Sequence, residues 1–119
     1  MSPVLSLPPN LELALPPTAG EVAWSTFIAE QMGGQAEVRL MDKSRCDILT
    51  DTHAIEVEWI KKATQAPGQA LLYAALTGRK PGVILLSRGK PREEIYFLRS
   101  GIMCAHAGID MAVVKTLGG

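Results

Sequence analysis

Three acidic side chains lie on two neighbouring segments that are predicted to pair as strands. Asp47 lies in the first segment, and Glu56 and Glu58 lie in the second. Asp51 and Thr52 stand between them and favour a turn. If the strands close symmetrically about that turn, Asp47 lies opposite Glu56, where cross-strand Cβ atoms are about 4.5–5.5 Å apart. Carboxylates this close need a cationic partner, and an all-oxygen ligand set favours Mg²⁺ or Mn²⁺.

This site depends on the register of the two strands. Because strand side chains alternate, Glu56 and Glu58 share one face, and the apolar residues between and around them share the other. A slip of one residue would send Asp47 to the opposite face from Glu56 and remove the site. The same register places Arg45 opposite Glu58. Pairing with Arg45 and Arg39 would instead make the carboxylates structural ion pairs, without a metal.

The order of these residues resembles the signature of the PD-(D/E)XK nuclease superfamily. In that family an aspartate on one strand and an acidic-X-lysine triplet on the next strand hold a catalytic metal. Asp47 and the triplet 56–58 match those positions. Cys46 stands where the family has proline, and Glu58 stands where it has lysine. Some restriction enzymes of the superfamily carry a glutamate at the lysine position and are active.

A second motif extends the resemblance to about residues 21–86. Gln69 and Tyr73 look like the Gln-X-X-X-Tyr motif on the helix after the triplet in exonuclease-type members. The resemblance implies a Mg²⁺- or Mn²⁺-dependent nuclease acting on nucleic acid, with DNA as the expected substrate. The implied roles are metal binding by Asp47, Glu56, Glu58, the Val57 carbonyl and Glu21, a charge-balancing catalytic role for Lys61, and substrate contacts by Gln69, Tyr73 and Lys62.

Several of these residues have a structural interpretation as well. Glu21 completes a capping box that starts at Thr18, so it could cap the first helix instead of joining the metal site, as the first-helix glutamate of resolvase-like members does. Gln69 and Tyr73 share a helix face and could bond neighbouring backbone. Lys61 and Lys62 could be surface charges at a strand end.

One of these two lysines could also supply the cation that is missing at position 58. By strict alternation Ile60 shares the face of the glutamates and Lys61 does not, so Lys61 would need a bulge or a strand end to reach the site. We favour Lys61 over Lys62 for this role.

The chain has 119 residues and 47% apolar residues, which predicts one domain at 18–119 after a proline-rich extended arm at 1–17. Cys46 and Cys104 lack metal-ligand spacing and are expected to be small buried hydrophobes in a reducing compartment. No secretory signal and no membrane span are recognisable. A cytoplasmic location without membrane partners is expected.

The net charge of zero hides an asymmetry between the two halves of the chain. Up to Glu58 most charged residues are acidic, and after it most are basic. An acidic half that binds metal and a basic half that meets phosphate would suit a nuclease, whereas two solvated faces that happen to segregate would look the same.

The pattern predicts helices and strands in the order α-β-β-β-α-β, followed by an α-β extension. This order gives an α/β fold with a central mixed sheet flanked by helices, similar to restriction endonucleases. Apolar stripes are expected to face the core on the first helix (Trp24, Phe27, Ile28 and Met32) and the second (Leu71, Leu72, Ala75 and Leu76). The expected segments are helix 18–33, strands 36–41, 46–50 and 54–59, helix 67–78, strand 82–87, helix 91–107 and edge strand 109–115.

The function expected from this reasoning is metal-dependent hydrolysis of phosphodiester bonds. The small domain has no separate DNA-reading module, which suggests a homodimer. A nucleic-acid-binding module without hydrolysis is an alternative, favoured by the missing lysine of the triplet. A metal-free structural or inhibitory protein is another, and it requires the carboxylates to be paired with arginines.

Overall fold

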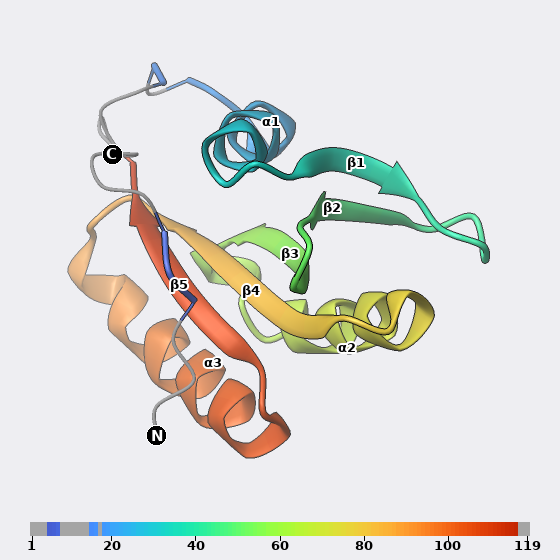
Figure 1. Ribbon diagram of the computed structural model, residues 1–119. Coiled ribbons are helices and arrows are strands. Elements are labelled where there is room, and N and C mark those ends of the chain that lie inside the picture. Colours follow the sequence, from blue (N-terminus) through green and yellow to red (C-terminus); the bar gives the residue numbers. More distant parts are fainter. Residues whose placement is uncertain (1–4, 8–14, 17, 117–119) are drawn as a thin grey trace.

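The computed structural model of the chain describes residues 5–7, 15–16 and 18–116. Within them lie three α-helices, five strands and two short 3-10 helices (Figure 1). In chain order these are α1 (Glu21–Gln31), β1 (Gln35–Arg39), β2 (Arg45–Leu49), β3 (His53–Trp59), η2 (Ile60–Lys62), α2 (Ala66–Thr77), β4 (Lys80–Ser87), η3 (Pro91–Glu93), α3 (Glu94–Ala107) and β5 (Asp110–Lys115).

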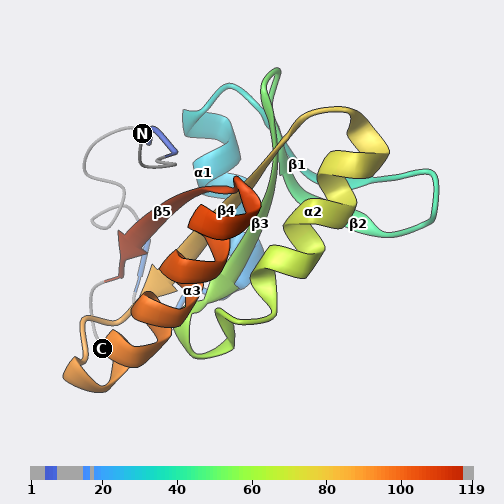
Figure 2. The same ribbon diagram turned by 90° about the horizontal axis from the view of Figure 1, so that it is seen from below.

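The strands form one mixed sheet in the order β1-β2-β3-β4-β5. The first three are antiparallel neighbours, whereas β3, β4 and β5 run parallel to one another. Helix α1 covers one face of the sheet, and α2 and α3 cover the other (Figures 1 and 2). The expected α/β fold, a central mixed sheet flanked by helices, is therefore confirmed.

Strand β4 is buried on both of its faces, as its continuous apolar run predicts. Ile84 and Leu86 join the core beneath α1, where Trp24 and Ile28 are buried as expected from their helical spacing. Val83 and Leu85 join the core beneath α2 and α3. The sheet thus separates two apolar layers, with β3 and β4 at its centre.

Helix α1 begins differently from the prediction. The N-cap residue is Gly20 and makes no side-chain cap hydrogen bond, so the capping box proposed for Thr18 and Glu21 is wrong. Glu21 is the first helical residue, and its carboxyl group is free to face other side chains. The helix ends at Gln31, close to the predicted glycine stop, and Gly33 adopts a left-handed φ of 70°.

The β2–β3 hairpin has the register that the site requires. Ile48 pairs with Ile55 and Leu49 pairs with Ala54, which places Asp47 level with Glu56. The Thr50 amide donates to the His53 carbonyl over 2.9 Å and closes the turn. A one-residue slip is therefore excluded.

The apolar stripe predicted for α2 is wrong. Leu71 and Leu72 are 42% and 40% exposed, and Ala75 is exposed. The buried face consists instead of Ala66, Pro67, Ala70 and Tyr73. Pro67 lies in the first turn and Gly78 ends the helix with φ 71°, both as predicted.

The outer elements complete the core. Strand β5 forms an edge of the sheet, and the Leu5 amide from the arm donates to its Met111 carbonyl over 3.0 Å. Leu5 is 5% exposed, so this described part of the arm packs along the body.

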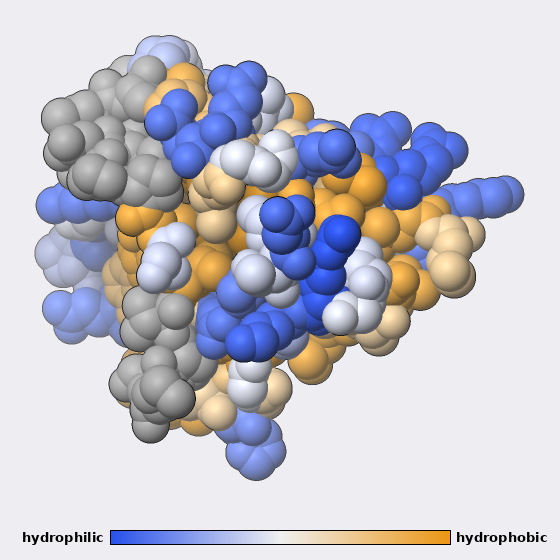
Figure 3. All heavy atoms as spheres, in the orientation of Figure 1, coloured by the Kyte–Doolittle hydropathy of each residue, from blue (hydrophilic) through white to orange (hydrophobic). Residues whose placement is uncertain are grey.

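Cys46 and Cys104 are buried free thiols, as expected. The tip of the β1–β2 hairpin is hydrophilic (Figure 3), with Asp42 and Lys43 exposed. No described helix is long and apolar enough to cross a membrane.

Candidate metal centre

Asp47 occupies a break in the ladder between β2 and β3. Its Oδ2 atom accepts a hydrogen bond from the Val57 amide over 2.8 Å, so the side chain takes the place of a backbone partner. The pairing of the two strands stops at Ile48 and Ile55. Because the amide and carbonyl of one strand residue face the same neighbouring strand, the Val57 carbonyl also points toward Asp47. A carboxylate and a backbone oxygen thus meet in one gap.

Glu56 lies next to Asp47 and is only 6% exposed. Burial first, and then a side-chain hydrogen bond with Asp47 and the negative charges of Asp47, Glu58 and Glu21, raise the pKa of Glu56 to about 10. At neutral pH the Glu56 carboxyl group therefore stays protonated. Its O–H group donates a hydrogen bond to Asp47.

Glu58 and Glu21 extend the cluster from two different elements. Burial, followed by a side-chain hydrogen bond with Glu58 and the charges of Glu58 and Asp47, raises the pKa of Glu21 to about 8. Glu58 also accepts a hydrogen bond from the Trp59 amide over 3.0 Å. The start of α1 therefore brings Glu21 to the strand residues, as the resolvase-like pattern implies.

Glu37 of β1 is a further member that the sequence did not single out. Burial and the charge of Asp47 raise its pKa, Arg45 lowers it, and a side-chain hydrogen bond with Asp47 raises it again. Its φ of 54° is left-handed, which is unusual for a residue with a side chain. The β1–β2 register places Glu37 opposite Asp47, and this register was the available signal.

The cluster has no cationic partner at ion-pair distance within the described part of the chain, where the one ion pair joins His53 and Asp110. Structural ion pairs of Asp47, Glu56 and Glu58 with arginines are therefore not seen among the described residues. This applies to both candidates, Arg39 and Arg45. No group of three or more His, Cys, Asp or Glu side chains among the described residues is already arranged to hold a metal ion. The side chains instead contact one another in pairs, since hydrogen bonds with Glu58 and with Asp47 are among the causes that raise the pKa values of Glu21 and Glu56.

The remaining predicted residues lie at different distances from the cluster. Tyr73 is buried, and burial, then the charges of Glu56 and Asp47, raise the pKa of its hydroxyl. Gln69 is exposed one helical turn earlier on α2.

The two lysines of η2 have separate surroundings. The positive charge of Lys62 reaches Glu21 and lowers its pKa. Lys61 is exposed and lines a neighbouring pocket beside Trp59. Lys62 is therefore the lysine whose charge the structure brings to the carboxyl groups.

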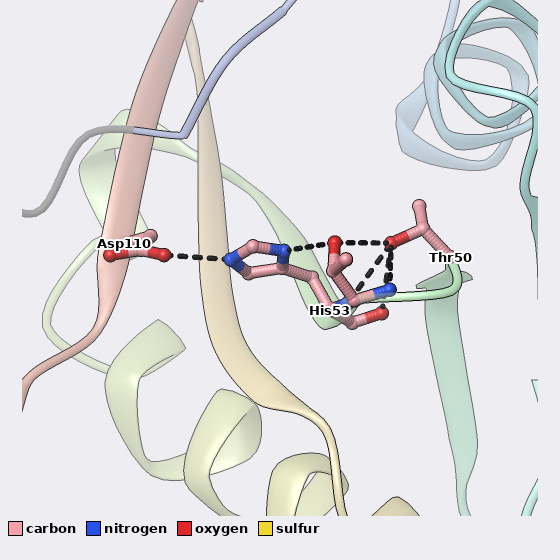
Figure 4. A network of polar contacts seen from close by, with 4 residues as sticks. Thr50, His53 and Asp110 are labelled. Carbon is pink, nitrogen blue, oxygen red and sulfur yellow. Dashed lines mark hydrogen bonds and ion pairs between the residues drawn. The ribbon is translucent and has the colours of Figure 1, made fainter.

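A polar network at the other end of β3 has a structural explanation. His53 Nε2 lies 2.7 Å from Asp110 Oδ2, and His53 Nδ1 lies 2.7 Å from Thr52 Oγ1 (Figure 4). His53 thus links the β2–β3 turn to β5 across β4. Both ring nitrogens have partners, and the network clamps the turn.

Comparisons of the chain with protein-family models, curated proteins and solved structures gave no match. The functional argument therefore depends on the carboxyl cluster itself.

Proposed function

We propose that the chain is a metal-dependent nuclease that hydrolyses phosphodiester bonds of nucleic acid, most readily of DNA, on a restriction-endonuclease-like fold. The observation that carries the proposal is the convergence of Glu21, Asp47, Glu56 and Glu58 without a cation at ion-pair distance among the described residues. Maintaining such a cluster costs stability, since each ionised carboxylate raises the pKa of the others. A divalent metal would offset that cost.

The donor chemistry fits Mg²⁺ or Mn²⁺. The available atoms are carboxylate oxygens and the Val57 carbonyl, without the sulfur or imidazole ligands that zinc and copper prefer. Asp47 is already oriented by the Val57 amide. Glu21 and Glu56, whose pKa values are raised, would release a proton on binding, and the side chains of Glu21, Glu56 and Glu58 would turn toward the metal.

Each residue then has a defined task. When bound, the metal supplies Lewis-acid activation of a phosphate and of a water nucleophile. Asp47 and Glu56 would hold it, and Glu58 and the Val57 carbonyl would supply further oxygen ligands. Lys62 contributes positive charge near Glu21, and Lys61 and Gln69 are exposed, so that both could contact the nucleic-acid backbone. Tyr73 is buried on α2, near enough to Glu56 and Asp47 for their charges to raise the pKa of its hydroxyl.

A second candidate function is nucleic-acid binding without hydrolysis. Glu58 stands at the position of the family's lysine, and its carboxylate is engaged by Glu21 and the Trp59 amide. Such a descendant would keep the substrate contacts and lose turnover.

Cleavage of labelled linear, nicked and branched DNA, and of RNA, tests the proposal. The wild-type protein should cleave at least one substrate with Mg²⁺ or Mn²⁺ and none with a chelator. Asp47→Asn preserves the shape of the side chain and should abolish cleavage. Asp51→Asn makes the same change at an exposed turn residue and should leave cleavage intact.

The outcomes separate the two candidates. Binding of DNA without cleavage under any metal would favour the non-hydrolytic module. Equal cleavage by wild type and Asp47→Asn would show that a contaminant or a different site is responsible, and would contradict the proposal.

A further inference from the structure

A pocket of about 390 Å³ opens beside the carboxyl ends of β3 and β4. Its lining comes from the end of β3, from η2, and from the connection between β4 and α3. Carboxyl ends of parallel strands are common ligand sites in α/β proteins. The lining residues are Trp59, Ile60, Lys61, Arg88, Lys90, Arg92, Glu93 and Tyr96.

The pocket is strongly basic. Four of its lining side chains are lysine or arginine, and none of them forms an ion pair with a described residue. The single acidic residue, Glu93, is 6% exposed and fully engaged by the loop itself. It accepts hydrogen bonds from the Ser87 hydroxyl at 2.7 Å and the Arg88 amide at 3.0 Å. The pocket therefore presents uncompensated positive charge to a ligand.

The loop that carries these cations is held in place before any ligand arrives. Besides the bonds to Glu93, the Gly89 amide donates to Ser87 Oγ over 3.0 Å, and the Thr116 hydroxyl donates to the Ser87 carbonyl over 3.1 Å. Gly89 has a left-handed φ of 71°, which a glycine adopts without strain. A pre-organised loop loses little conformational freedom when it binds.

Two aromatic rings complete the pocket. Trp59 lies beneath the Arg88 guanidinium, which is 4.2 Å from the ring centroid, and Tyr96 faces the pocket from α3. A flat cation stacked on an indole, beside a second ring, offers planar surfaces on which a nucleobase can stack. An acidic peptide could pair with the lysine and arginine side chains, but it has no flat base to stack on the aromatic rings.

The pocket adjoins the carboxyl cluster. Glu58 and Trp59 are consecutive, and the Trp59 amide donates to the Glu58 carboxylate.

We propose that this pocket binds one nucleotide of a single-stranded nucleic acid, holding its phosphate with Arg88, Lys90 and Arg92 and stacking its base against the Arg88–Trp59 pair and Tyr96. The proposal deepens the proposed nuclease function by naming an unpaired strand as its substrate, while the argument for binding uses only the pocket itself. The pocket itself would select unpaired strands, since a base inside a duplex cannot reach the rings.

Tryptophan fluorescence measures this binding directly. Trp24 is 1% exposed in the core, so quenching by a ligand reports on Trp59. The probes are an oligothymidylate of about 8 nucleotides, within the usual range for single-strand sites, the same strand with abasic sugars, and polyglutamate. All titrations contain a chelator, so that no strand is cleaved. The oligothymidylate should quench Trp59 and bind about 10-fold more tightly than the abasic strand.

Matched variants locate the effect. Arg92→Gln should weaken oligothymidylate binding about 10-fold and make it less sensitive to salt. Arg99→Gln removes the same charge from an exposed position of α3 outside the pocket and should bind like wild type. Thermal unfolding of both variants checks that they are folded.

Three results would overturn the proposal: equal affinity for the abasic strand and the oligothymidylate, equal affinity of the two arginine variants, or binding of polyglutamate as tight as that of the oligothymidylate. Asp47→Asn separates this proposal from the nuclease function, because it should abolish cleavage and leave quenching by oligothymidylate unchanged.

Discussion

Replacing Glu56 by glutamine should stabilise the metal-free protein at neutral pH. The pKa of Glu56 is raised by burial, and then by Asp47, from 4.5 to about 10. Below about pH 4.5 the carboxyl is protonated in both the folded and unfolded states, so its contribution to stability is fully present. As the pH rises toward 10, the unfolded state ionises and the folded state must take up a proton, so stability is lost.

The magnitude follows from this difference in protonation. At pH 7 the unfolded-state pKa of 4.5 lies 2.5 units below the pH, and 1.36 kcal/mol per unit gives a cost on the order of 3 kcal/mol. Glutamine keeps the shape of the side chain and can donate a hydrogen bond to Asp47, as the protonated carboxyl does. It has no proton to take up, so most of the cost should disappear. In a chain of this size the melting temperature would rise by about 10 °C.

Urea unfolding in the presence of a chelator, from about pH 5 to pH 8.5, measures the effect. Wild type should lose stability across this range, and Glu56→Gln should lose much less, with a residual slope from Glu21, whose pKa burial and Glu58 raise to about 8. Glu30→Gln, at an exposed position of α1, should follow wild type. A variant with the wild-type pH dependence, or one less stable than wild type at every pH, would refute the reasoning.

Three further outcomes are expected. Mn²⁺ should raise the melting temperature of wild type more at about pH 8 than at about pH 5.5, because the carboxyl ligands must lose protons to bind the metal. Equal shifts of the melting temperature at both pH values would argue against a carboxylate site. Glu37→Gly should stabilise the metal-free protein by about 1 kcal/mol in urea unfolding, since glycine tolerates the φ of 54°; a loss of stability would show that Glu37 is not strained. Gly82→Ala should cost about 1–2 kcal/mol by the same method, because the new Cβ would lie 3.0 Å from Ile55 Cγ1; an unchanged midpoint would show that the sheet adjusts freely.

The central hairpin could be predicted from the sequence because two local signals agree there. Turn formers stand between two segments that alternate in polarity, and both imply the pairing of Ile48 with Ile55 that the structure has. The helices were harder to orient. Leucine and alanine occur around most of α2, so periodicity alone could not show that Ala66, Ala70 and Tyr73 take the inner face.

The site was predictable only where alternation along a strand holds. Asp47, Glu56 and Glu58 follow from the register of one hairpin. Glu37 lies opposite Asp47 only through the β1–β2 register, which was not predicted from the sequence. The capping box at Thr18 matched a sequence pattern, but Gly20 took the N-cap position and left Glu21 for the cluster. The basic pocket beside Trp59 joins residues 59–61 to residues between 88 and 96, so only the fold could bring it together.

Calorimetric titration of Mn²⁺ into wild type and Asp47→Asn at about pH 8 tests most directly whether the carboxyl cluster is a metal centre. The account predicts saturable binding at a defined stoichiometry, with release of protons, in wild type and in Asp51→Asn, and loss of that binding in Asp47→Asn. Absence of saturable binding in wild type, or identical binding in Asp47→Asn, would contradict it.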